Sequence, residues 1–92
     1  MAEQSNVFIV LQRNEETRPI VDAILADNPG AVVDEQPAMV KIDVPHRLVI
    51  RRDTIENEIG GDYDLRAVHV NLVTLTGNVD ESDDEFILSW RD

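Results

Sequence analysis

Hydrophobic residues occur on both faces of the stretch His69–Asn78, which is the longest strand that the pattern predicts. Successive side chains of a strand point to opposite faces. Val70 and Leu72 would then lie on one face, and Val73 and Leu75 on the other. A strand with apolar residues on both faces is covered on both sides, within its sheet or by another molecule. The pattern therefore predicts a central strand, or a strand whose second face meets a partner protein.

The other hydrophobic runs are short and are separated by turn residues. Met39–Val44 alternates apolar and polar residues, which indicates a strand with one buried face. The turn Pro45–Arg47 follows it and predicts a hairpin with Leu48–Arg51. Three further strands are predicted, at Val7–Leu11, Ala31–Glu35 and Phe86–Trp90.

Two helices are predicted between these strands. Thr17 is the candidate N-cap of the first helix, with Pro19 in its first turn, and residues 27–30 (Asp-Asn-Pro-Gly) end it. The run Asp53–Glu56 has the spacing of a capping box, although Ser or Thr is the usual cap in that motif. Gly60–Gly61 ends this second helix.

Residues 62–67 can hold a third short helical turn, and residues 79–85 are predicted to form a charged loop. This order of elements is typical of an α+β fold, with short helices on one side of a mostly antiparallel sheet. The length of 92 residues fits one domain. We therefore expect a single domain over residues 1–92, with residues 1–6 as a flexible tail.

Composition excludes several classes of partner and site. The chain carries 19 acidic and 8 basic residues, a net charge of −11, so nucleic acids and anionic membranes are not expected partners. A basic protein surface suits this charge better, although acidity can also simply keep a small protein soluble. There is no cysteine, hence no disulfide or thiolate zinc site. The N-terminus lacks a basic signal-peptide start, and the early apolar run Val7–Leu11 is far too short to span a bilayer, so we expect a cytoplasmic protein.

Residues suited to catalysis or metal binding are sparse. His46 and His69 are the two histidines, and neither lies in H-x-x-x-H or E-x-x-H spacing. The acidic run Asp80–Glu85 lacks the glycine that a calcium loop needs at its sixth position. No serine lies in G-x-S-x-G, so a binding or regulatory module is favoured over an enzyme.

Two alternatives remain open. One is a regulatory domain that binds a small metabolite in an enclosed apolar pocket. The other is a small hydrolase or isomerase in which His46 or His69 meets acidic residues in a cleft.

A mixed strip in the predicted long strand is the strongest candidate for a binding surface. Asn71, Thr74 and Thr76 are interleaved with the apolar Val73 and Leu75. Apolar and hydrogen-bonding residues mixed in this way are typical of the core of an interface. Threonine also has a high β propensity, so the same strip fits an ordinary sheet interior.

Taken in order, several segments resemble the regulatory (effector) proteins of bacterial multicomponent diiron monooxygenases, most closely those of the phenol hydroxylase type. No single segment is diagnostic, and the ordered set, which covers nearly the whole chain, makes the resemblance specific. The matching segments are Val7–Leu11, Arg18–Val21, Gln36–Ile42, Ile50–Asp53 with Gly60, Asp64–Leu65, Val70–Asp80 and Phe86–Trp90.

This resemblance implies a non-catalytic protein that carries no cofactor and no metal. Such proteins dock on the diiron hydroxylase component, over the helices that shelter its metal centre. Docking alters the access of oxygen and substrate and couples electron transfer to hydroxylation. The resemblance also implies that the protein and the reductase component compete for the same region of the hydroxylase.

The resemblance assigns the hydroxylase interface to the segment around Asn71–Gly77, which influences substrate access in the methane-oxidising relatives. Val73 and Leu75 replace small polar residues of those relatives, so Asn71 carries over most directly. The residues expected at the interface are Asn71, Val73, Thr74, Leu75, Thr76 and Asn78.

Overall fold

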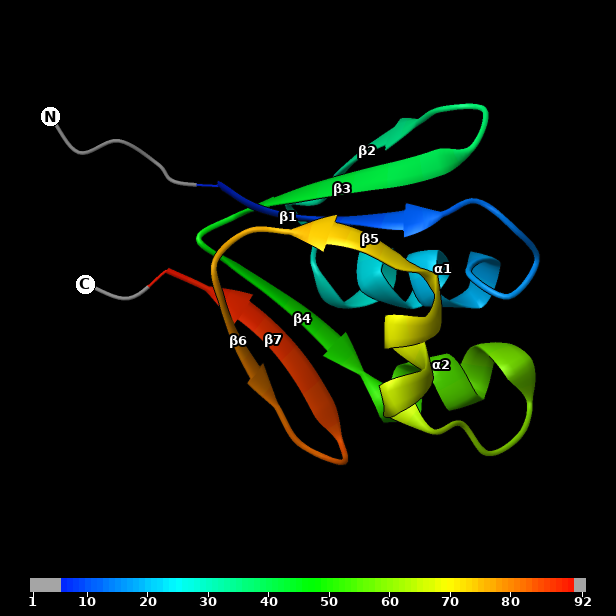
Figure 1. Ribbon diagram of the computed structural model, residues 1–92. Coiled ribbons are helices and arrows are strands. Elements are labelled where there is room, and N and C mark those ends of the chain that lie inside the picture. The colour runs from blue at the N-terminus through cyan, green and yellow to red at the C-terminus, as the bar shows by residue number, and fades with distance from the viewer. Residues whose placement is uncertain (1–5, 91–92) are drawn as a thin grey trace, which may run out of the picture.

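Seven strands and three helices form the described part of the computed structural model, residues 6–90 (Figure 1). The strands are β1 (Asn6–Gln12), β2 (Val32–Glu35), β3 (Met39–Pro45), β4 (Arg47–Arg51), β5 (Leu72–Leu75), β6 (Asn78–Glu81) and β7 (Glu85–Ser89). The helices are α1 (Arg18–Asp27), α2 (Arg52–Ile59) and the 3₁₀ helix η1 (Leu65–Asn71). The strands pair antiparallel, so the predicted α+β class is confirmed.

The strands divide between two sheets, where the sequence pattern suggested one. A four-stranded sheet has the order β2-β3-β1-β5, and a three-stranded sheet has the order β4-β7-β6. The chain passes from one sheet to the other at His46. Its φ of 68° lies in the left-handed region that residues other than glycine rarely adopt. The predicted hairpin between Met39–Val44 and Leu48–Arg51 is therefore wrong. The second of these strands pairs with β7 instead, because Leu48 and Leu88 face the same core.

The hydrophobic core lies between the helices and the two sheets. Figure 1 shows α1 behind β1 and β5. The alternation in β3 has the predicted effect, because Val40, Ile42 and Val44 are all buried. Each helix adds buried side chains to this core, such as Ile24 from α1 and Ile55 from α2. No helix within residues 6–90 is long and apolar enough to cross a membrane.

The predicted long strand from His69 to Asn78 is wrong, because it is broken into three elements. Its first part is the end of η1, its middle is the short edge strand β5, and its last residue begins β6. The chain turns between β5 and β6 at Gly77, whose φ is +96°. The predicted charged loop at residues 79–85 is wrong in its bounds, because only residues 82–84 lie between the strands. Residues up to Glu81 belong to β6, and Glu85 already belongs to β7.

The helices begin and end close to the predicted residues, but the predicted side-chain capping hydrogen bonds do not form. Thr17 is the N-cap residue of α1, but its hydroxyl donates to Gln12 O at 2.7 Å and makes no cap bond. The predicted capping box is wrong, because Asp53 lies inside the first turn of α2. The Glu56 carboxylate instead accepts from the backbone N–H of Tyr63 at 2.9 Å. Gly60 ends α2 in the left-handed conformation, as predicted.

The side chains of Asn28 and Trp90 make hydrogen bonds that tie distant elements together. The buried Asn28 donates to Ile24 O and Val49 O at 2.7 and 2.8 Å and accepts from Val49 N at 2.9 Å, which joins α1 to β4. Trp90 Nε1 donates to Asn6 O at 3.1 Å. Residues 1–5 of the predicted tail lie outside the described residues, whereas Asn6 belongs to β1 and the prediction is wrong for it.

Candidate protein-docking surface

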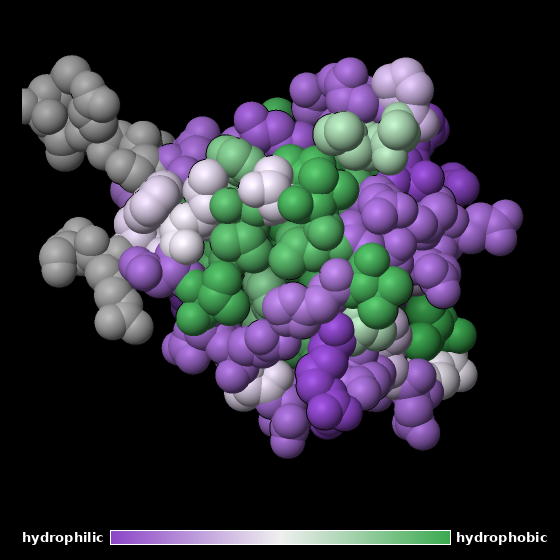
Figure 2. Space-filling view, in the orientation of Figure 1, coloured by the Kyte–Doolittle hydropathy of each residue, from purple (hydrophilic) through white to green (hydrophobic). Residues whose placement is uncertain are grey.

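The predicted interface segment lies where the two sheets adjoin. Strands β5 and β6 are the free edges of their respective sheets and are consecutive in the chain. Figure 2 shows a patch of hydrophobic side chains near the centre of the face on which Figure 1 shows β1 and β5. Polar residues surround this patch in the same view. An apolar centre with a polar rim is the general arrangement of a protein interface.

Three of the six expected interface residues are exposed in the structure. Val73, Thr74 and Asn78 are exposed, and Val73 has 48% of its surface accessible. Leu75 and Thr76 are half-buried. Asn71 is buried, with 6% exposed, so its side chain lies beneath the surface that its neighbours form.

A bulge in β5 explains why Val73 is exposed although it lies in a strand. Thr74 is opposite Val10 and Leu72 is opposite Leu11, so Val73 is the extra residue between two paired ones. A bulge of this kind redirects a side chain and interrupts the ladder. Leu72 and Leu75 pack against the core, whereas Val73 is left to solvent.

Three further exposed hydrophobic residues flank this segment, and sequence reasoning missed them as surface residues. Val70 precedes β5 and is 71% exposed, and Val79 follows it and is 44% exposed. Trp90, at the end of β7, is 47% exposed. The extended-strand interpretation hid the exposure of Val70, because it placed Val70 on the same strand face as Leu72, which packs against the core.

Two side chains of η1 make polar contacts with acidic residues. His69 Nε2 lies 2.9 Å from a Glu81 carboxylate oxygen. Asp64 accepts from both the guanidinium and the backbone N–H of Arg66, and these bonds lower the pKa of the Asp64 carboxyl below its ordinary value. The pKa of Tyr63 is raised, first because the phenol is partly buried and then because Glu16 and Asp64 lie near it.

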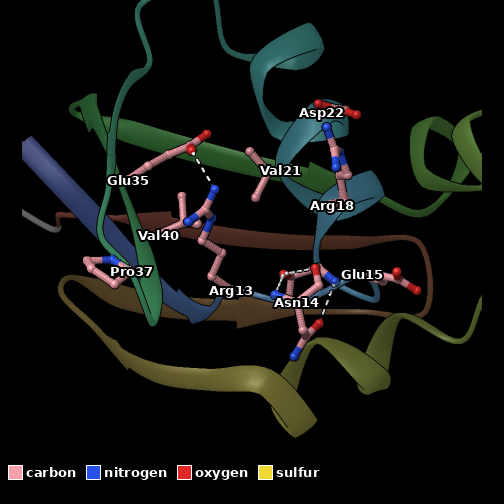
Figure 3. Close-up of a pocket in the computed structure, with 10 residues that line it drawn as sticks. Arg13, Asn14, Glu15, Arg18, Val21, Asp22, Glu35, Pro37 and Val40 are labelled. Carbon is pink, nitrogen blue, oxygen red and sulfur yellow. Dashed lines mark hydrogen bonds and ion pairs between the residues drawn. The ribbon is translucent and has the colours of Figure 1, made fainter.

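A second surface feature is an open hollow of about 390 Å³ between the loop after β1, the start of α1 and the β2–β3 hairpin (Figure 3). Arg13 reaches across it to Glu35, with 3.5 Å between the nitrogen and the oxygen. Arg18 and Asp22 line its helical side. The hollow is open and half of the residues that line it are charged, unlike the enclosed apolar pocket that the small-metabolite alternative requires.

His69 lines an open hollow with Glu81 and Ser82, but within residues 6–90 no hydrogen bond joins either histidine to a hydroxyl nucleophile. His46 is exposed in the turn between the sheets, and His69 packs edge-on against the Phe86 ring at 5.5 Å. The Ser82 hydroxyl is occupied in its own turn, where it accepts from Glu85 N at 3.1 Å. Within residues 6–90, no group of three histidine, aspartate or glutamate side chains is placed to hold a metal ion.

Known proteins resemble this chain in sequence over nearly its whole length. The MmoB/DmpM family matches residues 5–89. The phenol 2-monooxygenase stimulatory component DmpM of Pseudomonas sp. (strain CF600) is 46% identical over 87 residues, which cover 95% of this chain and 97% of that protein. The effector subunit of the alkene monooxygenase system of Xanthobacter autotrophicus (strain ATCC BAA-1158 / Py2) is 28% identical over 85 residues, covering 90% and 84%.

Solved structures give the same result for the fold. A chain of a phenol hydroxylase–regulatory protein complex matches with a TM-score of 0.90 and 45% identity, covering 95% of this chain and 100% of that one. The soluble methane monooxygenase regulatory protein B shares the fold, with a TM-score of 0.73 and 17% identity over 99% of this chain and 70% of that one. With a family match over most of its length and a relative at 46% identity, the chain belongs to the MmoB/DmpM family.

Proposed function

We propose that the chain is the regulatory component of a multicomponent monooxygenase of the phenol hydroxylase type. It binds the diiron hydroxylase component, has no catalytic site or cofactor of its own, and works in the cytoplasm. The observation that carries the proposal is the 46% identity, over 95% of the chain, to a phenol 2-monooxygenase stimulatory component. The match to a chain of a phenol hydroxylase–regulatory protein complex supports the hydroxylase as the partner.

The proposed contact surface is the docking strip, which comprises Val73, Thr74, Leu75, Thr76 and Asn78, with Asn71 beneath it. The exposed Val73 supplies apolar area, and Thr74 and Asn78 supply hydrogen-bonding groups. Their position on the free edges of two sheets supports this choice, because residues at free edges have no neighbouring strand to cover them.

The mechanism is a shift between hydroxylase conformations. A regulatory protein changes an equilibrium only if it binds the active conformation more tightly than the resting one. Coupling energies of about 1–3 kcal/mol are typical of such effects. In the proposal, docking changes oxygen and substrate access and couples electron transfer to hydroxylation. The reductase component competes with the chain for the same region of the hydroxylase.

The proposed function is tested by mixing the chain with the cognate hydroxylase and reductase and measuring phenol hydroxylation with and without it. Stoichiometric amounts should raise the rate or the fraction of electrons that reach product. The isolated chain should turn over no substrate. Unchanged rate and unchanged coupling would reject the proposal.

The docking strip is tested with a matched pair of charge-introducing substitutions. Val73 and Val32 are both exposed valines at opposite edges of the four-stranded sheet. Val73→Glu should raise the half-saturating concentration of the chain by about tenfold or more, because a charge would be buried at the interface. Val32→Glu should leave that concentration unchanged. Thr74→Glu should act like Val73→Glu, and native circular dichroism of all three variants would exclude unfolding as the cause.

Equal stimulation by the Val73→Glu, Thr74→Glu and Val32→Glu variants would move the docking surface to another part of the chain without affecting the proposed function itself.

A further inference from the structure

The buried amide of Asn71 marks the point where η1 ends and β5 begins. Its side chain is 6% exposed, so it needs hydrogen-bond partners within the protein. Asn14 Nδ2 donates to Asn71 Oδ1 at 2.9 Å, across 57 positions of the sequence. Asn71 Nδ2 has a longer contact of 3.5 Å with a Glu16 carboxylate oxygen. The Asn14 bond is therefore the main one that holds the Asn71 side chain.

Asn14 is itself held in place by the loop between β1 and α1. Its Oδ1 accepts from the backbone N–H of Thr17 at 3.0 Å. Thr17 is 1% exposed, and its hydroxyl donates to Gln12 O at 2.7 Å, at the end of β1. The Asn14–Asn71 pair thus connects the start of β5 to a fixed point between β1 and α1.

Few other hydrogen bonds hold β5 in its position. It is a four-residue edge strand, paired on one side only, and the bulge at Val73 interrupts its pairing with β1. At its far end, Thr76 is bonded to Phe8 through its backbone N–H and its hydroxyl oxygen, both at 3.0 Å. The Asn14–Asn71 pair and Thr76 thus hold the two ends of the segment on which Val73 and Thr74 are exposed.

We propose that Asn14 and Asn71 are positioning residues for docking: they fix the start of β5 so that Val73 and Thr74 meet the hydroxylase in the correct place. Asn71 acts through Asn14 and the strand, and its buried amide makes no contact with the partner. This inference rests on the proposed function. It gives the loop before α1 a role in docking, although that loop is far from β5 in the sequence.

The test is a double-mutant cycle with Asn14→Ala, Asn71→Ala and the double variant. The half-saturating concentration for stimulation of phenol hydroxylation is measured, together with the maximal rate. Each single substitution should raise the half-saturating concentration by about five- to tenfold, the effect of losing one partly buried hydrogen bond whose free energy serves to position β5. The double variant should be no worse than the worse single variant, because both remove the same bond.

Asn28→Ala is the matched control. Asn28 is another asparagine with 6% exposure. In the described structure its side chain bonds only to backbone atoms of α1 and β4. This substitution should lower the melting temperature and leave the half-saturating concentration unchanged. If it raises that concentration as much as Asn71→Ala does, general destabilisation explains the effect and the proposal is overturned.

Other outcomes also overturn it. Additive effects of the two substitutions would mean independent contacts with the partner, and wild-type behaviour of Asn14→Ala would mean that this bond positions nothing. Asn14 is exposed, so its removal leaves no cavity and that variant should fold.

A second measurement needs no hydroxylase. Backbone amide NMR signals of Val73 and Thr74 should shift or broaden in Asn14→Ala and stay unchanged in Asn28→Ala. Unchanged signals in Asn14→Ala would overturn the positioning role. If the wild-type chain fails to stimulate, the proposed function fails, and the NMR result still decides whether the pair positions β5.

Discussion

Asp64 and Arg66 show how a local contact sets where an element begins. The Asp64 carboxylate accepts from the backbone N–H of Arg66 at 3.1 Å and from its guanidinium at 2.9 and 3.1 Å. The backbone bond caps the first turn of η1. A charged carboxylate accepts these bonds better than a protonated one, so they lower the pKa of Asp64.

Arg66→Ala should therefore raise the pKa of Asp64 toward its ordinary value of 3.8. In the wild type, the lowered pKa means that the pair stabilises the fold above that ordinary value, and that this contribution is lost as the pH falls through the lowered pKa. Carboxyl carbon NMR shifts recorded through an acid titration measure the effect. Titration of Asp64 at the same pH in both proteins would contradict it.

At the scale of elements, the turn between β5 and β6 constrains the docking strip more than the two strands themselves do. Gly77 turns the chain from β5 to β6 at φ +96°, and a Cβ there would lie 3.0 Å from Val7 Cγ1 and 3.1 Å from Ser89 O. Only glycine satisfies both the backbone angle and the close approach. The turn thus lies within the docking strip and fixes the position of Asn78 relative to Thr76.

Alanine substitutions at three glycines should have graded effects on stability. Gly77→Ala should lower the free energy of unfolding by about 2–4 kcal/mol, from backbone strain and steric clash together. Gly60→Ala should lower it by about 1 kcal/mol, because φ is +74° there but nothing lies within 4 Å of the added Cβ. Gly61→Ala, which has neither constraint, should stay within about 0.5 kcal/mol. Urea unfolding measures the series, and a different order would contradict this explanation.

Elements with a strong periodic pattern could be predicted from the sequence, and β3 is the best example, because its alternation matches its buried face. The break of the long strand was harder to see, because Val, Thr and Leu all favour strands. A signal was present, since Leu65, Val68 and Asn71 are all buried and recur every three residues, the period of a 3₁₀ helix. Val73 and Thr74 are exposed, and their contact with a partner stays a prediction. The burial of Asn71 depends on Asn14, which no local pattern identifies.

The whole molecule carries a net charge of −11, with 19 acidic residues against 8 basic ones. Several basic side chains are already paired, such as Arg52 with Asp84 at 2.8 Å and Arg13 with Glu35. Such a molecule is attracted from a distance to a basic surface, and this attraction increases the rate of association more than the final affinity.

Association with the hydroxylase should therefore slow as salt is added, by about tenfold between 0.05 and 0.5 M, because the Debye length becomes shorter. The chain has no cysteine, so a dye on a single Val32→Cys substitution, far from β5 in the sheet order, can report binding by stopped-flow anisotropy. Circular dichroism at each salt concentration controls for unfolding. An association rate that does not depend on salt would exclude long-range steering.

The hydrogen bond from Trp90 Nε1 to Asn6 O places the two limits of the described backbone next to each other. A short linker would join them into a closed ring. New termini could then be opened at the exposed Gly60–Gly61 turn, which lies between α2 and η1 and interrupts no strand. Such circular permutants would alter the order in which the two sheets are synthesised while keeping the same final surface, and so would separate the demands of folding from those of docking.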